Sequence, residues 1–524
     1  MRLFSMNLSQ TRARLVKAGA AFAAAALVAG CGSQYRPVVT PINPSGPPAQ
    51  PNSLAVVVSS SSLTTPGIAT IIDYSGDTIM ATAPIGPGPT SFTLDGPGST
   101  GYTVNSDRTV TNFPASTNLQ EKNVLVTTLP TTAQSTGLFS PATGLWAVDQ
   151  CSMAGNVCTS AVDVFTGSPQ TFKLSIPVAA TPIAVVGPAT AAQRNYSLSL
   201  NNSKTPAGSV IPYTDMTCNN TPRTVTQTGE ADSLEVSTYT VSARIPLGKC
   251  PVYAVQNNDS KRLFVLNRGD DTVTVINSQN NTLDECAPFV SQTGRLVICH
   301  PTLPLSLTAV NALNAIKPGS GNPPNGSAGM TAIAGPVYAE YNTTTGQLIV
   351  ADYDGGTISV IDVSLDIYGN DSATFGTTFT IPVGKNPAVA PYPASVTVLN
   401  DGSRAYTANQ AEGSVTIVNL SSHTVVTTLP VTGHPRTVVS TSNSLYGKVY
   451  VASPDSPYLT ILRTDQDIVD TTVLVQGSIL DVRVSSPNGT GSNINVTSRR
   501  PGAGQPCYLP PPVPATLAAC QTLP

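Results

Sequence analysis

The sequence predicts an all-β protein, a seven- or eight-bladed β-propeller of four-stranded antiparallel blades. The first observation is a repeated phrase of a proline, an aliphatic residue, three variable residues and a second proline. It recurs at steps of about 47 residues, with one lengthened and one doubled step. The second observation is a set of short apolar strands between the phrases. Copies of the phrase begin at Pro84, Pro177, Pro246, Pro382 and Pro430, with a worn copy at Leu129.

Each clear repeat contains four strand signals. A short apolar strand such as Leu263–Asn267 comes first, then a polar glycine-bearing turn. The second strand, such as Val273–Asn277, alternates apolar with small or polar residues, which is the period of a half-buried strand. A third strand, such as His423–Leu429, runs into the proline phrase. A fourth, such as Ala394–Leu399, leads into the hairpin turn of residues 400–402. Four strands in about 47 residues predict one propeller blade.

The prolines fit this architecture because proline cannot donate a hydrogen bond to a sheet ladder and therefore lies at strand ends and edges. We expect the first proline of each phrase to end an outer strand and the second to open an inner one. The alternative is a β-sandwich with accidental prolines. Five copies at one internal spacing argue against it.

We count eight repeats, whose first strands begin near residues 54, 100, 145, 194, 262, 348, 404 and 449. If the degenerate repeat near 194–250 is misread, the ring has seven blades. The first repeat lacks an inner strand, and a spare strand remains at Ile479–Val484. That strand would complete the first blade, close the ring and hide two sheet edges.

Leu263–Thr282 resembles the YVTN family β-propeller repeat, as do Gln347–Ser364 and Arg404–Pro435. The resemblance is good over residues 261–486 and weak over 54–250. It implies a WD40-like propeller architecture. It extends to the lactonase-type propellers and to those of quinoprotein dehydrogenases.

Residues 1–30 are predicted to be a lipoprotein signal peptide, with a basic start and an apolar run, Ala18–Val28, that is too short to span a bilayer. Residues 27–31 resemble a bacterial lipobox, which implies that Cys31 is the lipidated first residue of the mature chain. In a diderm bacterium Gly32 would favour the outer membrane. The alternative is an ordinary secretory signal with a chance cysteine. The expected location is extracytoplasmic, with the lipid anchor as the contact with the membrane.

The remaining chain divides by composition. Residues 31–53 are proline-rich and are expected to form a spacer after the anchor. Residues 54–486 hold the repeats, and 487–524 form a proline-rich C-terminal tail. Residues 317–328 are expected to be a flexible inserted loop inside the fifth repeat.

Eight cysteines remain after Cys31, and an even number in an exported chain indicates disulfides. Eight cysteines allow many connectivities, and the local one is a hypothesis. A zinc site is the alternative, but no pair has two-residue spacing, and we predict no metal. The proposed pairs are Cys151 with Cys158, Cys218 with Cys250, Cys286 with Cys299, and Cys507 with Cys520.

The chain has few charged residues and no recognisable catalytic motif. Only 10% of residues are charged and the net charge is −3, which argues against nucleic-acid binding. No catalytic or phosphate-binding motif is present, and no cofactor is expected. A structural role is favoured for His300, His423 and His434, with His423 facing solvent and His434 in a blade-linking loop. The single tryptophan, Trp146, argues against a quinoprotein.

Acids follow the second strand in several repeats, where other repeats carry asparagine. They could form a ring that binds a cation. We favour caps of the following turn, because a recurring residue indicates a requirement of the fold. The acids are Asp73, Asp163 and Asp362, and the asparagines are Asn277 and Asn419.

Two classes of function remain, and we favour the first. It is a lipid-anchored binding or scaffold protein with a protein or glycan ligand on a propeller face, where the long insertions 202–240, 284–335 and 364–377 would cluster. The second is a lactonase-like hydrolase on the same frame, which rests on resemblance alone. It would need carboxylates or histidines that converge at the channel mouth.

Overall fold

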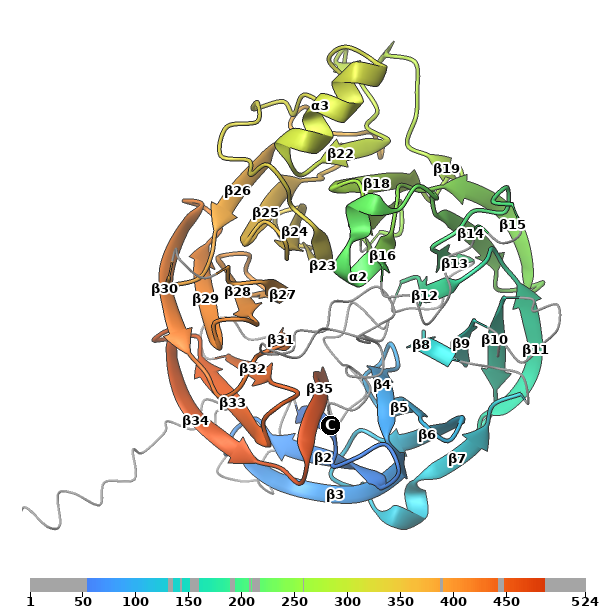
Figure 1. Cartoon of the computed structure of the whole chain (residues 1–524), viewed down its shortest axis with the longest axis vertical. Helices are drawn as coiled ribbons and strands as arrows, with labels where there is room; N and C mark the ends of the chain where they lie inside the picture. Colours follow the sequence, from blue (N-terminus) through green and yellow to red (C-terminus); the bar gives the residue numbers. More distant parts are fainter. Residues whose placement is uncertain are drawn as a thin grey trace, which may run out of the picture. The chain divides into compact units, whose positions relative to one another are not determined.

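The computed structural model describes residues 54–485. The described range excludes 131–134, 142–143, 151–159, 189–193, 207–208, 210–216, 258, 387–389 and 442–446. The signal peptide, Cys31, the spacer, the tail, and the pairs Cys151–Cys158 and Cys507–Cys520 lie outside these residues. The described chain forms an eight-bladed β-propeller of four-stranded antiparallel sheets around a central axis (Figure 1).

The blades are numbered along the chain. Blades 1 to 4 contain β35 (Ser478–Ser485), β1 (Leu54–Ser60), β2 (Pro66–Asp73), β3 (Thr78–Pro87); β4 (Pro89–Leu94), β5 (Thr100–Asn105), β6 (Thr109–Pro114), β7 (Leu125–Thr128); β8 (Ser135–Phe139), β9 (Leu145–Asp149), β10 (Ala161–Thr166), β11 (Thr171–Pro177); and β12 (Pro182–Val186), β13 (Arg194–Ser199), β14 (Glu230–Glu235), β15 (Thr240–Pro246).

Blades 5 to 8 follow the same plan, from the inner to the outer strand. They contain β16 (Pro251–Gln256), β17 (Arg262–Asn267), β18 (Thr272–Asn277), β19 (Thr282–Leu283); β23 (Pro336–Asn342), β24 (Gln347–Asp352), β25 (Thr357–Asp362), β26 (Thr378–Pro382); β27 (Pro393–Val398), β28 (Arg404–Asn409), β29 (Ser414–Asn419), β30 (Thr424–Pro430); and β31 (Thr437–Ser440), β32 (Lys448–Ala452), β33 (Tyr458–Arg463), β34 (Ile468–Leu474).

The predicted repeat count is confirmed, and the seven-blade alternative is wrong. Residues 194–250, the doubtful repeat, contain three of the four strands of blade 4. The strand predicted to begin near residue 194 is β13, the second strand of that blade. The ring closes as expected, because β35 pairs antiparallel with β1 from Leu54 opposite Ser485 to Ser60 opposite Ser478. The first blade therefore takes its inner strand from the end of the described chain.

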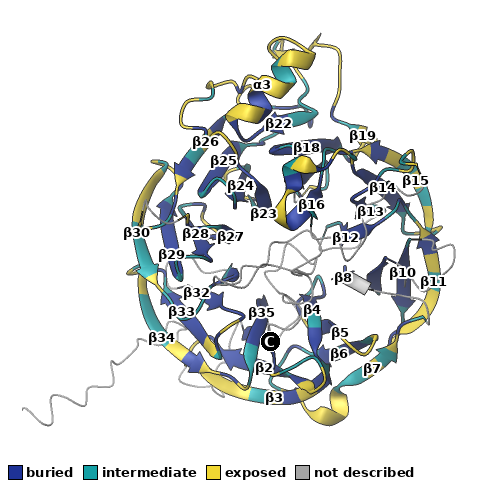
Figure 2. Ribbon diagram, viewed as in Figure 1, coloured by how far each residue is buried: buried dark blue, intermediate teal, exposed yellow. Residues whose placement is uncertain are grey.

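Burial follows the radial position of each strand. The second and third strands of the blades are almost wholly buried, whereas the outer strands alternate and expose residues (Figure 2). The cores lie between neighbouring blades, where faces such as those of β16 and β23 meet. In blade 6, for example, Ile349 and Ile358 are fully buried.

The prolines have the predicted positions in most blades. Pro177, Pro246, Pro382 and Pro430 end outer strands, and Pro89, Pro182 and Pro251 open inner ones. Three prolines depart from this pattern. Pro84 lies inside β3, the inner strand of blade 7 opens at Pro393 and not at Pro387, and β31 opens at Thr437, two residues after Pro435. Pro393 lies opposite Asn409, as Pro251 lies opposite Asn267.

The outer edge of blade 5 is built from two pieces. β19 pairs with one end of β18, and β22 (Thr302–Pro304) pairs with the other end. Pro304-Leu305 therefore takes the place of the proline phrase in this blade, which explains the doubled step in the sequence. Between the two pieces the chain makes an excursion, residues 285–301, that holds the hairpin β20 (Phe289–Val290) and β21 (Leu296–Val297).

A helix that the sequence analysis did not predict follows this edge. α3 (Leu307–Ile316) begins at Ser306, whose hydroxyl accepts from the N–H of Ala309. The expected loop 317–328 comes next and is tied to blade 6, since Asn325 Nδ2 donates to the carbonyl of Thr378 at 2.8 Å. The other short helices are η1 (Glu121–Asn123), α2 (Thr217–Asn220) and η2 (Pro222–Thr224).

Candidate functional site

Antiparallel pairing divides the loops between two faces. We call one the interblade face: it carries the links from one blade to the next, such as residues 247–250, and the turns between second and third strands, such as 268–271. The opposite face carries the other turns. Leu54 and Ser485, the ends of the described chain, lie on the opposite face because they begin a second strand and end an inner one.

The sequence analysis expected the long insertions to cluster on one face, but they lie on two faces. Residues 200–229 join β13 to β14, and 305–335 link blade 5 to blade 6; both start and end on the interblade face. Residues 363–377 join β25 to β26 and lie on the opposite face. The face of a loop is set by which strands it joins, and this expectation was therefore wrong for 364–377.

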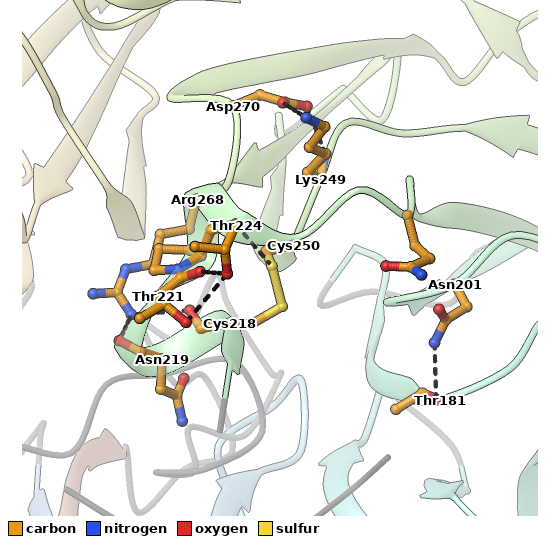
Figure 3. Close-up of a disulfide and its surroundings, with 12 residues drawn as sticks. Thr181, Asn201, Cys218, Asn219, Thr221, Thr224, Lys249, Cys250, Arg268 and Asp270 are labelled. Carbon is orange, nitrogen blue, oxygen red and sulfur yellow. Dashed lines mark hydrogen bonds and ion pairs between the residues drawn. A yellow bond between two sulfur atoms is a disulfide. The ribbon is translucent and has the colours of Figure 1, made fainter. Parts of the chain in front are cut away.

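A disulfide fixes the insertion of blade 4 onto blade 5. Cys218 in α2 is bonded to Cys250, the residue before β16, as predicted (Figure 3). Cys250 is fully buried. Beside it, Arg268 Nη1 donates to the carbonyls of Cys218 and Asn219 at 3.1 and 2.6 Å. The short helical segment α2–η2 is thereby held on the interblade face.

An ion-pair network continues from this segment toward blade 6. Arg268 Nη2 lies 2.7 Å from Asp354 Oδ1, and the Arg268 side chain is 2% exposed. Arg223, in η2, reaches Asp271 Oδ1 at 2.6 Å and Asp354 Oδ2 at 3.1 Å. The N–H of Gly335 also donates to Asp271 Oδ1 at 2.8 Å. Three successive blades thus share one set of charge-assisted hydrogen bonds.

A recurring contact fastens several of the described links to the blades that they enter. The N–H of Lys249 donates to Asp270 Oδ2 at 2.6 Å, and the N–H of Lys385 donates to Glu412 Oε2 at 2.9 Å. Sequence analysis missed these acids. Their signal is an acid three residues after the end of the second strand, as in Asn267-Arg268-Gly269-Asp270.

His434 takes part in the same kind of contact. Its N–H donates to Asp455 Oδ1 at 2.8 Å, and its Nδ1 lies 2.6 Å from Asp455 Oδ2. The sequence analysis placed His434 in a blade-linking loop, and the structure confirms this position between β30 and β31. The pair joins a link to a turn, which is a structural role.

The other two histidines lie on the opposite face or the outer edge. His300 Nδ1 is 2.8 Å from Asp371 Oδ2, and its ring stacks on Phe375 with centroids 5.3 Å apart. The ring of His423 stacks on that of Phe379 in the neighbouring outer strand, with the ring centroids 3.8 Å apart. Burial lowers the pKa of His423. The expectation that His423 faces solvent was therefore wrong in part.

Most of the acids and asparagines after strands cap turns, as predicted. Asp73 Oδ1 accepts from the N–H of Ser75, and Asn419 Oδ1 accepts from that of Ser421. Asp362 and Asn277 make equivalent contacts. Asp163 does not cap a turn, because it lies inside β10, where its Oδ1 accepts a hydrogen bond from the hydroxyl of Ser175. Burial raises the pKa of Asp163 to about 6.

A further repeated contact links the second and third strands. Asn267 Nδ2 donates to the hydroxyls of Thr272 and Thr274, and Asn409 and Asn105 make the same pair of bonds in their own blades. Asp352 occupies this position in blade 6 and accepts from Thr357 and Ser359. Its carboxyl is buried, and this burial raises its pKa to about 8.

A second predicted disulfide is present among the described residues. Cys286 is bonded to Cys299, and together with Cys218–Cys250 this indicates an oxidising, extracytoplasmic environment.

Within the described ranges, no three His, Cys, Asp or Glu side chains are arranged to hold a metal ion. No helix in that part of the chain is both long and apolar enough to cross a bilayer.

No family model and no curated protein sequence matches the chain. Solved structures are similar in fold. AztD from Citrobacter koseri, in its apo form, aligns with a TM-score of 0.51 at 10% identity over 84% of this chain and 98% of that one. The dihydro-heme d1 dehydrogenase NirN, in complex with DHE, aligns with a TM-score of 0.51 at 15% identity over 87% and 80%.

A periplasmic gluconolactonase of Pseudomonas aeruginosa, PpgL, aligns with a TM-score of 0.46 at 12% identity, covering 83% of this chain and 99% of that one. At their identities, the likeness of AztD and NirN shows the propeller fold alone. One fold hosts many functions, so the function has to be argued from the faces of this propeller.

Proposed function

We propose that the chain is a lipid-anchored extracytoplasmic β-propeller that binds a protein or glycan ligand on its interblade face. The lipobox-like residues 27–31 support the anchor at Cys31. The two disulfides support export. The low charge of the chain fits a ligand that is recognised by shape and neutral hydrogen bonds.

The observation that carries the proposal is the α2–η2 segment with the residues after it. Its backbone is fixed by Cys218–Cys250 and by Arg268, yet a row of hydroxyls and amides beside it is exposed. A rigid frame that presents small polar side chains loses little conformational entropy on binding. The exposed side chains are Asn220, Thr221, Thr224, Thr226 and Thr228.

The alternative is a lactonase-like hydrolase on the same frame. Its test is the hydrolysis of a sugar lactone by the purified protein. On the interblade face His434 and Asp455 are the described histidine–carboxylate pair, so the alternative expects turnover that His434→Gln abolishes. Binding without turnover supports the first proposal.

The experiment for the binding proposal places a photoreactive amino acid at Thr226 in living cells. We expect cross-linked adducts from this exposed position and none from Ser422, an equally polar exposed position on the opposite face. A glycan array with the purified protein covers a carbohydrate ligand. Adducts of equal yield at both positions, or none together with a blank array, would contradict the proposal.

The anchor has its own test. Cys31→Ser removes the acceptor of the lipid, and we expect the precursor to remain unprocessed and the mature protein to leave the membrane fraction. Unchanged processing and fractionation in this variant would show that Cys31 is not the anchor.

A further inference from the structure

An exposed apolar surface lies at the rim of blade 5, near the opposite face. The hairpin β20–β21 places Val290 opposite Leu296, so these two side chains share one side of the ribbon, and Ile298 follows on that side. They are 68%, 56% and 51% exposed. On the other side of the ribbon, Val297 is buried at 1%, and Phe289 opposite it is 41% exposed. The hairpin therefore turns three aliphatic side chains outward.

The turn of a second loop carries more apolar surface next to the hairpin. Ile367 and Tyr368 are 86% and 48% exposed in the loop between β25 and β26. Arg295 Nη2, beside Leu296, lies 3.1 Å from Asp366 Oδ2 in the same turn. We call Val290, Leu296, Ile298, Ile367 and Tyr368 the apolar patch.

The backbone of the patch is held in place. Cys286–Cys299 closes the excursion, and His300 Nδ1 lies 2.8 Å from Asp371 Oδ2 in the second loop. Arg262 Nη2 also reaches Asp371 Oδ1 at 3.3 Å and Asp284 Oδ1 at 3.1 Å. Exposed apolar side chains that gather on two fixed loops are typical of a surface that contacts another molecule or a membrane.

We propose that the apolar patch rests on the lipid surface to which Cys31 anchors the chain, an inference that depends on the anchor proposed above. The chain enters the propeller at Leu54 on the opposite face, and the patch lies toward that same face. Blade 5 is four blades from blade 1, across the ring (Figure 1). Residues 31–53 span at most about 80 Å when extended, so the propeller stays near the bilayer.

Two contacts on opposite sides of one face would lay that face along the membrane. The interblade face, with α2–η2, would then point away from the lipid. The charges beside the patch are paired, Arg295 with Asp366 and Lys261 with Asp259 at 3.1 Å. Burial of apolar surface in the interfacial region, without attraction to anionic headgroups, is therefore the expected mode of contact.

The test uses the full-length lipoprotein in phosphatidylcholine vesicles with brominated acyl chains, which quench tryptophan that enters the bilayer. Trp146, the single native tryptophan, is buried in the ring and supplies the background. We expect Leu296→Trp and Ile367→Trp to lose most of their added emission. The matched control is Leu474→Trp, because Leu474 is 57% exposed but lies at the interblade end of β34. It should keep its emission.

Quenching that is the same in zwitterionic and anionic vesicles supports the apolar mode of contact. Vesicle flotation with no quenching at either patch position overturns the inference and leaves the anchor intact. A shift of the patch emission to shorter wavelength without quenching shows a protein cover, such as a second copy, and also overturns it. Failure to float with the vesicles refutes both the anchor and the patch contact.

Discussion

Asp352 carries a buried carboxyl at a position where other blades use asparagine. The side chain accepts hydrogen bonds from Thr357 and Ser359 at 3.2 and 2.7 Å, while Asn267 and Asn409 donate to the corresponding hydroxyls. Burial raises the pKa of Asp352 to about 8. The folded state therefore favours the protonated acid, which resembles an amide in shape and charge.

This shift makes stability depend on pH in a defined direction. The contribution of protonated Asp352 is present below the ordinary aspartate pKa and is lost as pH rises toward 8. We expect Asp352→Asn to be more stable than the wild type at pH 8, and the difference to shrink toward pH 5 by at most about 1.4 kcal/mol per pH unit. Denaturant midpoints across this range measure it.

The matched control for this prediction is Asp107→Asn, on an exposed turn between β5 and β6. Its midpoint should follow the wild type at every pH. An Asp352→Asn variant whose advantage is independent of pH would show that the buried carboxyl does not titrate in this range.

At the scale of single elements, the two described disulfides stabilise different parts of the chain. Cys286–Cys299 closes a loop with a sequence separation of 13 that leaves the ring and returns, whereas Cys218–Cys250 joins α2 to the start of an inner strand. The chain-entropy model gives about 3 and about 4 kcal/mol for loops of these lengths. The two contributions should act on different parts of the protein.

We expect Cys286→Ser/Cys299→Ser to open the excursion locally, with new protease cleavage within 285–301 and little change in the thermal midpoint. Cys218→Ser/Cys250→Ser should lower the midpoint of the ring, because Cys250 is fully buried against blades 4 and 5. Calorimetry with limited proteolysis distinguishes them. Equal midpoints in the two variants would contradict this division.

At the scale of the whole molecule, stability depends on the contact between the two ends of the described chain. β35 supplies the inner strand of blade 1 and buries Val482 completely in the core between blades 8 and 1. Loss of this strand would expose sheet edges at one gap of the ring. The closure therefore couples the first and last blades.

Val482→Asp places a charge in that core, and we expect the free energy of unfolding to fall by at least about 3 kcal/mol. The control is Val425→Asp in the outer strand β30, where the valine is 40% exposed. It should change stability little. Thermal unfolding followed by circular dichroism compares the two, and similar midpoints would argue that closure does not limit stability.

The sequence was sufficient for the features that repeat. Strand positions and ring closure follow from period and alternation, and turn caps such as Asp73 are local contacts. The period gave eight repeats but left a seven-bladed ring open, because the repeat near 194–250 is degenerate. The network of Arg223, Arg268 and Asp354 was not predictable, because it joins residues that are distant in the chain and occurs in one place. The sequence analysis did not recognise Pro304-Leu305 as a copy of the repeated phrase. The proline that opens the next inner strand, Pro336, lies far from Pro304 and not at the usual spacing.

The divided outer strand of blade 5 has a practical consequence. Leu283 and Thr302 hold the two ends of the edge in register with β18, and the chain between them contributes no strand to the ring. A foreign domain fused within residues 291–294, at the tip of the hairpin, should leave the propeller intact. Because Val290 and Leu296 of the apolar patch flank this tip, such a fusion should also lift the patch from the lipid surface, which gives a folded variant without that contact.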